Sequence, residues 1–185
     1  MYKIEKNKIT FENDYNLTDF IEIIQFYNEM NETKIDEIYF GEYFNQDISF
    51  LPQYITKIIF HEHSHFNQQI NFLPKKLTHL TLGESFNQSL DFLPKGLTHL
   101  KLGCDFYKPI DNLPDNLTHL ILDCSFDFSQ PLENLPKGLT HLKLGMYLNN
   151  PLDNLPEGLL ELKISKYYDE SLNSVPNNCL IIRQN

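Results

Sequence analysis

Residues 93–103 read Leu-Pro-Lys-Gly-Leu-Thr-His-Leu-Lys-Leu-Gly, and close copies of this stretch recur along the 185-residue chain. Within it, Leu100 and Leu102 alternate with His99 and Lys101, the pattern of a β-strand that buries one face and exposes the other. The proline that opens each copy follows leucine or valine at intervals of 22, 20, 20, 22, 20 and 20 residues, at Pro52, Pro74, Pro94, Pro114, Pro136, Pro156 and Pro176. A proline-less first copy at 35–40 and a degenerate last copy at 179–184 bring the number to eight.

The residues between these stretches also fall into columns. An apolar residue stands eight positions before each proline, at Phe44, Phe66, Phe86, Phe106, Phe128, Leu148 and Tyr168. A second apolar residue follows four positions later, at Ile48, Ile70, Leu90, Ile110, Leu132, Leu152 and Leu172. All ten prolines and seven glycines belong to such columns. The two longer units each carry an insertion, at 61–65 and 123–127, where a stacked array would form an outward loop.

The L-x-x-L-x-L pattern at this period predicts a mainly-β solenoid of the leucine-rich-repeat type, with one parallel sheet of about eight short strands. Units this short leave no room for a helix, so we expect an extended or polyproline convex side with at most a single tight turn. Residues 1–34 do not fit the repeat and are predicted to form an N-terminal cap, with 35–185 as the solenoid. In the cap, 2–4 and 9–11 favour a hairpin. Apolar residues at helical spacing, Phe26 among them, favour a helix over 17–30 with Asn16 as its N-cap.

The stretch from Phe86 to Gly103, Phe-Asn-Gln-Ser-Leu-Asp-Phe-Leu-Pro-Lys-Gly-Leu-Thr-His-Leu-Lys-Leu-Gly, resembles the FNIP repeat. This short leucine-rich-repeat variant is expanded in social amoebae and in giant viruses that infect amoebae. Some members of the family carry an F-box or a kinase domain, so the resemblance implies an adaptor role in ubiquitination or signalling. It brings no catalytic residues to this chain.

Charge and composition exclude several classes of function. A formal net charge of −10 disfavours binding to nucleic acid and to anionic membranes. No apolar run approaches the roughly 18–20 residues of a membrane span, and the first residues lack the apolar stretch of a secretory signal. Three cysteines do not suggest a disulfide scaffold. These features predict a cytoplasmic protein, in the host cytoplasm if the source is viral.

The exposed strand face is the candidate binding surface. Its predicted contact residues are Lys57, His79, His99, Lys101, His119, His141, Lys143 and Lys163. They predict a mildly basic face that titrates near neutral pH and suits a protein partner, possibly an acidic one. The alternative is that Thr-His-Leu was copied with the repeat and only tolerates solvent.

Three further features contain residues that can bind metal or form a disulfide. The stacked histidines could give two ligands to an ion but not a closed set, and the alternating His61, His63 and His65 could point three imidazoles one way. We expect neither to hold a metal, and we expect no cofactor and no catalytic residue. A metal-dependent enzyme remains an alternative, as does a disulfide between the column neighbours Cys104 and Cys124.

The C-terminal edge supplies the last alternative. Only three polar residues follow Leu180, Ile181 and Ile182, too few to form a cap. This edge could therefore mediate self-assembly or a homodimer.

Overall fold

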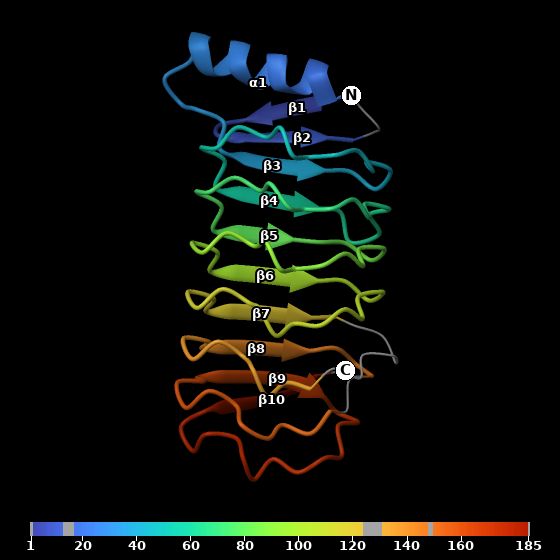
Figure 1. Ribbon diagram of the computed structural model, residues 1–185, viewed down its shortest axis with the longest axis vertical. Coiled ribbons are helices and arrows are strands. Elements are labelled where there is room, and N and C mark those ends of the chain that lie inside the picture. Colours follow the sequence, from blue (N-terminus) through green and yellow to red (C-terminus); the bar gives the residue numbers. More distant parts are fainter. Residues whose placement is uncertain (1, 13–16, 124–130, 148–149, 185) are drawn as a thin grey trace.

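The computed structural model describes residues 2–12, 17–123, 131–147 and 150–184. Its strands form one ten-stranded sheet in sequence order, with helix α1 across one end (Figure 1). The elements are β1 (Tyr2–Glu5), β2 (Lys8–Phe11), α1 (Leu17–Met30), β3 (Glu37–Phe40), β4 (Lys57–Phe60), β5 (His79–Thr81), β6 (His99–Leu102), β7 (His119–Leu122), β8 (His141–Leu144), β9 (Glu161–Ser165) and β10 (Leu180–Gln184). The sheet has two strands more than the repeats predict, because β1 and β2 form an antiparallel hairpin and β2 pairs in parallel with β3.

The repeat columns become ladders because the strands pair in register. Leu100 lies between Leu80 and Leu120, and every strand pair from β2 to β10 is parallel. The inward side chains are buried, and the phenylalanine column stacks inside the solenoid. Phe86 lies 6.1 Å from Phe66 and 6.3 Å from Phe106, with ring planes within 6°. Burial of each such side chain contributes about 1.5–3 kcal/mol, which explains why the apolar columns are kept in every unit.

We call one strand with its return path a rung. The return path bends through three β-turns, where the sequence suggested one at most. In the rung that starts at Gly83, the amides of Phe86, Leu93 and Leu97 each donate to the carbonyl oxygen three residues earlier, at 3.0–3.3 Å. The last of these carbonyls belongs to Pro94, the anchor of the repeat. Each proline therefore starts the turn that leads the chain back into the sheet.

The glycines that follow the strands are explained by close approach between rungs. A Cβ atom on Gly103 would lie 2.3 Å from the carbonyl oxygen of Gly83, and one on Gly83 would lie 2.4 Å from that of His61. Real Cβ contacts are never this short, so only glycine fits in these rungs. His61 and Asp123 replace this glycine in the two longer units, where the inserted residues follow.

Helix α1 covers the apolar end of the ladder next to the hairpin. Phe20 is buried and contacts Phe11 edge-on at a ring-centroid distance of 4.4 Å, with Phe40 at 5.8 Å. Ile24 is fully buried as well, which closes the end of the core as solenoids require. Phe26 was predicted to widen the buried stripe, but it is 67% exposed because it lies on the outer side of the helix. The predicted N-cap, Asn16, lies outside the described residues.

With 14 residues, α1 is shorter than a bilayer span needs, and none of the described helices is a candidate for crossing a membrane.

Candidate functional site

The predicted contact residues all line one shallow groove on the exposed strand face, with a volume of about 290 Å³. We call it the strand-face groove. It crosses β4 to β9, and all eight predicted residues contribute to its lining: Lys57, His79, His99, Lys101, His119, His141, Lys143 and Lys163. Ile59, Ile121 and Glu161 line it too. The groove therefore combines imidazoles, lysines and two apolar side chains.

Four imidazoles form a continuous stack along this groove. The ring centroids of His79, His99, His119 and His141 follow one another at 4.0, 4.1 and 4.1 Å, with planes inclined by only 15°, 13° and 6°. The parallel register of β5 to β8 produces this spacing, since it places the histidines directly opposite each other. We call these four residues the histidine stack.

The threonine before each histidine fixes the position of the imidazole proton. In every case the threonine Oγ1 lies 2.8–2.9 Å from the Nδ1 of the following histidine. The same hydroxyl donates to the carbonyl oxygen of the threonine one rung earlier, at 3.0–3.1 Å. When the hydroxyl gives its one proton to this carbonyl, it accepts from Nδ1–H. The proton then lies on Nδ1, and Nε2, on the opposite side of each ring, is the acceptor.

Three histidines of the stack have lowered pKa values. Burial, followed by repulsion from the neighbouring imidazoles, lowers the pKa of His99 from 6.5 to about 4. Burial also lowers the pKa of His79 and of His119, with Lys57 and His141 respectively as the next causes. The expectation that the face titrates near neutral pH was therefore wrong for His99, because burial and the neighbouring imidazoles both disfavour its charged form.

The face is also less basic than predicted, because its lysines are paired with carboxylates. Asp123 binds Lys101 at 2.8 Å and Lys143 at 3.0 Å. Burial alone would raise the pKa of Asp123, but the hydrogen bonds from both lysines outweigh it and lower the pKa. Lys163 lies 2.7 Å from Glu161. Lys57 similarly lies 3.6 Å from Glu37. Asp123 was missed as a site residue because it occupies a column that holds glycine in most rungs, at Gly41, Gly83, Gly103 and Gly145.

The histidines of the first insertion do not share one ligand position. His63 binds Glu84 through Nδ1 at 3.0 Å, and this hydrogen bond raises the pKa of His63. His65 instead contacts the Tyr43 ring edge-on, and the ring of His61 lies 5.7 Å from that of His63. The three imidazoles therefore contact different neighbours and do not form a common zinc site.

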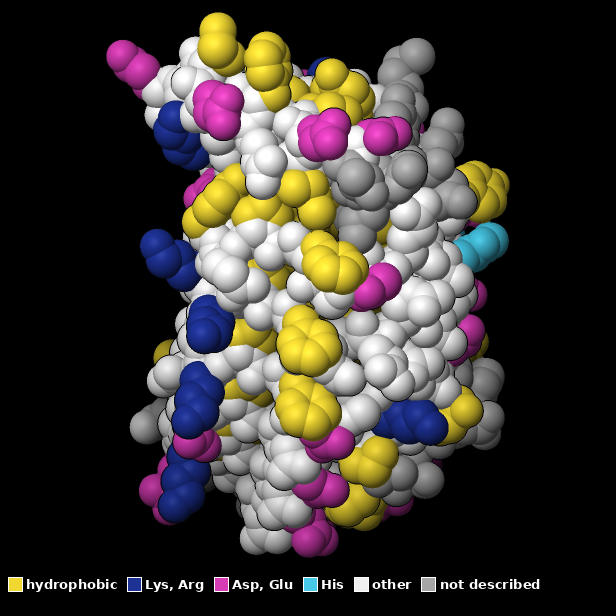
Figure 2. Space-filling view, turned by 45° about the horizontal axis from the view of Figure 1, so that its top comes forward, with side chains coloured by type: hydrophobic (Ala, Val, Ile, Leu, Met, Phe, Trp, Pro, Cys, Tyr) yellow, Lys and Arg dark blue, Asp and Glu magenta, His cyan; other side chains and the backbone are white. Residues whose placement is uncertain are grey.

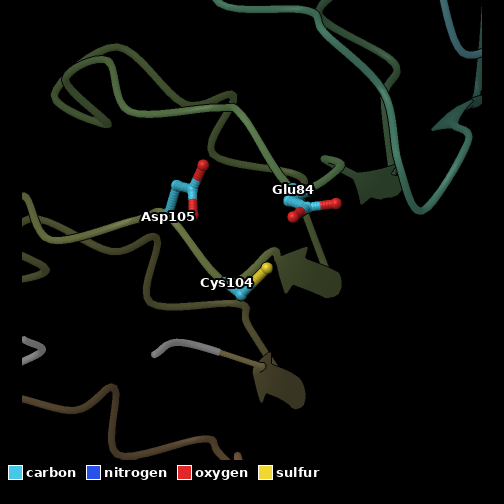
Figure 3. A group of neighbouring side chains, drawn as sticks. All are labelled: Glu84, Cys104 and Asp105. Atoms are coloured by element: carbon cyan, nitrogen blue, oxygen red, sulfur yellow. The ribbon is translucent and has the colours of Figure 1, made fainter. Parts of the chain in front are cut away.

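A different group of possible ligands lies beside this insertion. Glu84, Cys104 and Asp105 place their ligand atoms within 4.8 Å of one another (Figure 3). Burial, then the charges of Glu84 and Asp105, raises the pKa of the Cys104 thiol. Three donors that are not buried do not make the closed four-ligand set of a structural zinc site. Cys104 is a free thiol. Its predicted neighbour Cys124 lies outside the described residues.

At the C-terminal edge, β10 pairs with β9. Leu180 is 59% exposed and Ile181 38%, while Ile182 is partly buried. The three predicted edge residues thus present apolar surface on β10, which is paired with β9 on one side.

Parallel register, inward leucine columns and a repeat of 20–22 residues define this protein as a leucine-rich-repeat solenoid, an architecture that typically serves as a non-catalytic interaction scaffold. More specifically, a family model described as the FNIP Repeat matches residues 50–85, 66–105, 86–125 and 128–167. These matches cover more than half of the chain, which therefore belongs to the FNIP repeat family.

Among solved structures, the chain is similar to the protein CroV588, whose structure is described as a novel circular leucine-rich-repeat protein. The similarity has a TM-score of 0.84 and 37% identity over 97% of this chain. The chain spans only 28% of that protein's length. No curated protein sequence matches it significantly.

Proposed function

We propose that this protein is a non-enzymatic interaction scaffold that binds an extended segment of a protein partner in the strand-face groove. One observation carries the proposal: the histidine stack presents a row of imidazoles, one per rung, whose Nδ1 atoms are held by threonine hydroxyls and whose Nε2 atoms are left for a partner, between apolar side chains and paired lysines. A row of acceptors at regular spacing complements a chain that offers hydrogen-bond donors at intervals.

The same hydrogen bonds argue against catalysis at this surface. A serine- or threonine-type nucleophile needs a base that takes its proton. Here each threonine hydroxyl donates to a backbone carbonyl and accepts from the imidazole, so the imidazole cannot act as its base. Threonine and histidine in this repeat thus serve the architecture and the surface, in line with the absence of enzymatic activity that we propose.

The chemistry of the groove favours a particular kind of partner. Uncharged acceptors beside Ile59 and Ile121 suit a segment with amide, guanidinium or ammonium donors and apolar side chains. The acidic partner expected from the sequence stays a prediction, but pairing of the lysines with Asp123 and Glu161 leaves less positive charge to attract it. We propose that binding takes place in the cytoplasm, where Cys104 and Cys179 would stay reduced.

Selection from a library of random peptides displayed on phage tests the proposal without knowledge of the partner. We expect enriched peptides to carry donor side chains. We further expect their affinity to fall about tenfold or more in the double variant His99→Phe, His119→Phe, which keeps flat rings but removes two acceptors. The matched control is His61→Phe, His65→Phe, the same change outside the groove. Enrichment of acidic peptides would contradict this choice of partner. Equal peptide affinity of the groove variant and the control variant would contradict binding in the groove.

A second candidate function is self-assembly through β10. Its support is the apolar exposure of Leu180 and Ile181 on a strand edge, together with similarity to a protein described as circular. Light scattering over a concentration series tests it. A mass that rises with concentration, and that Ile181→Lys returns to the monomer value, would support assembly. A constant monomer mass would reject it.

A further inference from the structure

Three phenylalanines are exposed on the outer side of the solenoid, in three consecutive rungs. Phe50, Phe72 and Phe92 are 70%, 69% and 62% exposed, and each occupies the same position in the second turn of its rung. We call them the outer phenylalanine row. On the face drawn in Figure 2, exposed hydrophobic side chains form a row that runs along the stack.

The architecture does not require an aromatic residue at this position. The next two rungs carry asparagine there, and these residues link neighbouring rungs. The amide of Asn112 donates to Asp91 at 2.9 Å, and that of Asn134 donates to Asp111 at 3.0 Å. An exposed phenylalanine gains little from folding, so three in succession indicate a surface that contacts something else.

Amide side chains surround the middle of the row. A hollow of about 490 Å³ beside Phe72 is lined by Asn67, Gln68, Gln69, Asn71 and Gln88, with Asp47 as its charged residue. Hydrogen bonds hold some of these amides in place. The Nε2 of Gln68 donates to Asn45 at 3.1 Å, and the Nε2 of Gln88 donates to Asn67 at 3.0 Å. Because each amide has two N–H donors and a carbonyl acceptor, both glutamines keep capacity to bond a ligand.

The apolar area of the row and the charge of the hollow indicate what kind of ligand could bind there. Three rings at about two-thirds exposure present roughly 300–500 Å² of apolar surface. A stable protein interface takes about 800 Å² from each partner, which is more than the row offers. The hollow contains no lysine or arginine to hold a phosphate or an anionic lipid. The row therefore suits an uncharged ligand that covers less area than a folded protein partner would.

We propose that the outer phenylalanine row binds a linear, uncharged polysaccharide. One face of a sugar ring carries C–H groups that pack on an aromatic ring, while its hydroxyls both donate and accept, as the surrounding amides do. The ligand repeats as the surface does. Each of three consecutive rungs contributes one exposed ring to the row. This site is separate from the strand-face groove and does not depend on the function proposed for it.

Isothermal titration of the whole chain with four hexasaccharides tests the proposal: β-1,4-linked glucose, β-1,4-linked N-acetylglucosamine, β-1,3-linked glucose and α-1,4-linked glucose. We expect at least one to bind. Phe72→Asn, which introduces the residue found in this column at 112, should weaken that binding about tenfold, and the triple variant Phe50→Asn, Phe72→Asn, Phe92→Asn should abolish it. Phe26→Asn is the matched control, since Phe26 is equally exposed on α1 and outside the row.

Thermal unfolding verifies that the variants fold, and little change is expected because the replaced rings are mostly exposed. Failure of all four sugars to bind would overturn the proposal. So would binding that persists in the triple variant. A wild-type dimer that the triple variant dissolves, measured by sedimentation, would overturn it in favour of a second copy of the chain.

Discussion

Acid should destabilise the protein through His99, the second ring of the histidine stack. This ring lies 4.0 Å from His79 and 4.1 Å from His119, and its pKa falls from 6.5 to about 4. The folded pKa lies below the unfolded one, so the unfolded chain binds more protons between these values. The stabilisation is therefore complete above pH 6.5 and is lost as the pH falls towards 4.

The size of the effect follows from the same numbers. A pKa lowered from 6.5 to about 4 corresponds to a ceiling of about 3 kcal/mol. Because the ring is partly exposed, solvent screening reduces this to about 1–2 kcal/mol. For a chain of this size, such a loss lowers Tm by about 2–8 °C.

Two measurements check this prediction. An NMR titration of the histidine Hε1 resonances should show His99 titrating well below 6.5 and His63, whose pKa Glu84 raises, titrating above it. Thermal unfolding between pH 7.5 and 4.5 should show a steeper loss of Tm in the wild type than in His99→Phe, which keeps a stacked ring without a titrating group. A His99 resonance that titrates at pH 6.5 or above would show that the stack does not lower the pKa of this imidazole. Equal losses of Tm with falling pH in the wild type and in His99→Phe would contradict the prediction as well.

Three further predictions concern the solenoid. Gly103→Ala should lower the free energy of unfolding in urea by about 1–3 kcal/mol, because its Cβ would lie 2.3 Å from the carbonyl oxygen of the previous rung. Gly96→Ala, whose Cβ would have no atom nearer than 3.8 Å, should change this free energy by less than about 1 kcal/mol. Equal effects would contradict the close-approach argument. Phe86→Ala should lower the free energy of unfolding in denaturant by about 3–5 kcal/mol, because the ring is fully buried in the phenylalanine column. A loss below about 1 kcal/mol would contradict this packing. Asp123→Asn should lower the free energy of unfolding by about 1 kcal/mol and reduce its dependence on salt, because Lys101 and Lys143 lose their shared carboxylate. An unchanged salt dependence would show that these ion pairs contribute nothing in solution.

The sequence predicts the solenoid well because the repeat imposes the same local rule in every unit. The column of Leu80, Leu100 and Leu120 is visible as a period, and in-register pairing turns it directly into a buried ladder. The repeat begins at residue 35, so its pattern did not predict that the preceding hairpin joins the sheet. That outcome depends on how β2 meets β3, a contact between segments that share no repeated motif.

The candidate site was only partly predictable for a related reason. The alternation within each repeat placed the lysines and histidines on one face, but it could not show how they pair. Asp123 reaches lysines of two different rungs, and the lowered pKa of His99 depends on ring spacing that only the folded register sets. The outer phenylalanine row was visible as Phe-Leu-Pro in three units, but exposure alone separates Phe72 from its buried neighbour Leu73.

Binding at the histidine stack can be measured directly in a long-range ¹H–¹⁵N spectrum of the imidazole nitrogens at pH 7, recorded before and after addition of a peptide selected against the strand-face groove. We expect the rings of the histidine stack to carry their protons on Nδ1, and the peptide to shift their Nε2 resonances. Protons on Nε2, or Nε2 resonances that the bound peptide leaves unchanged, would contradict the proposed function.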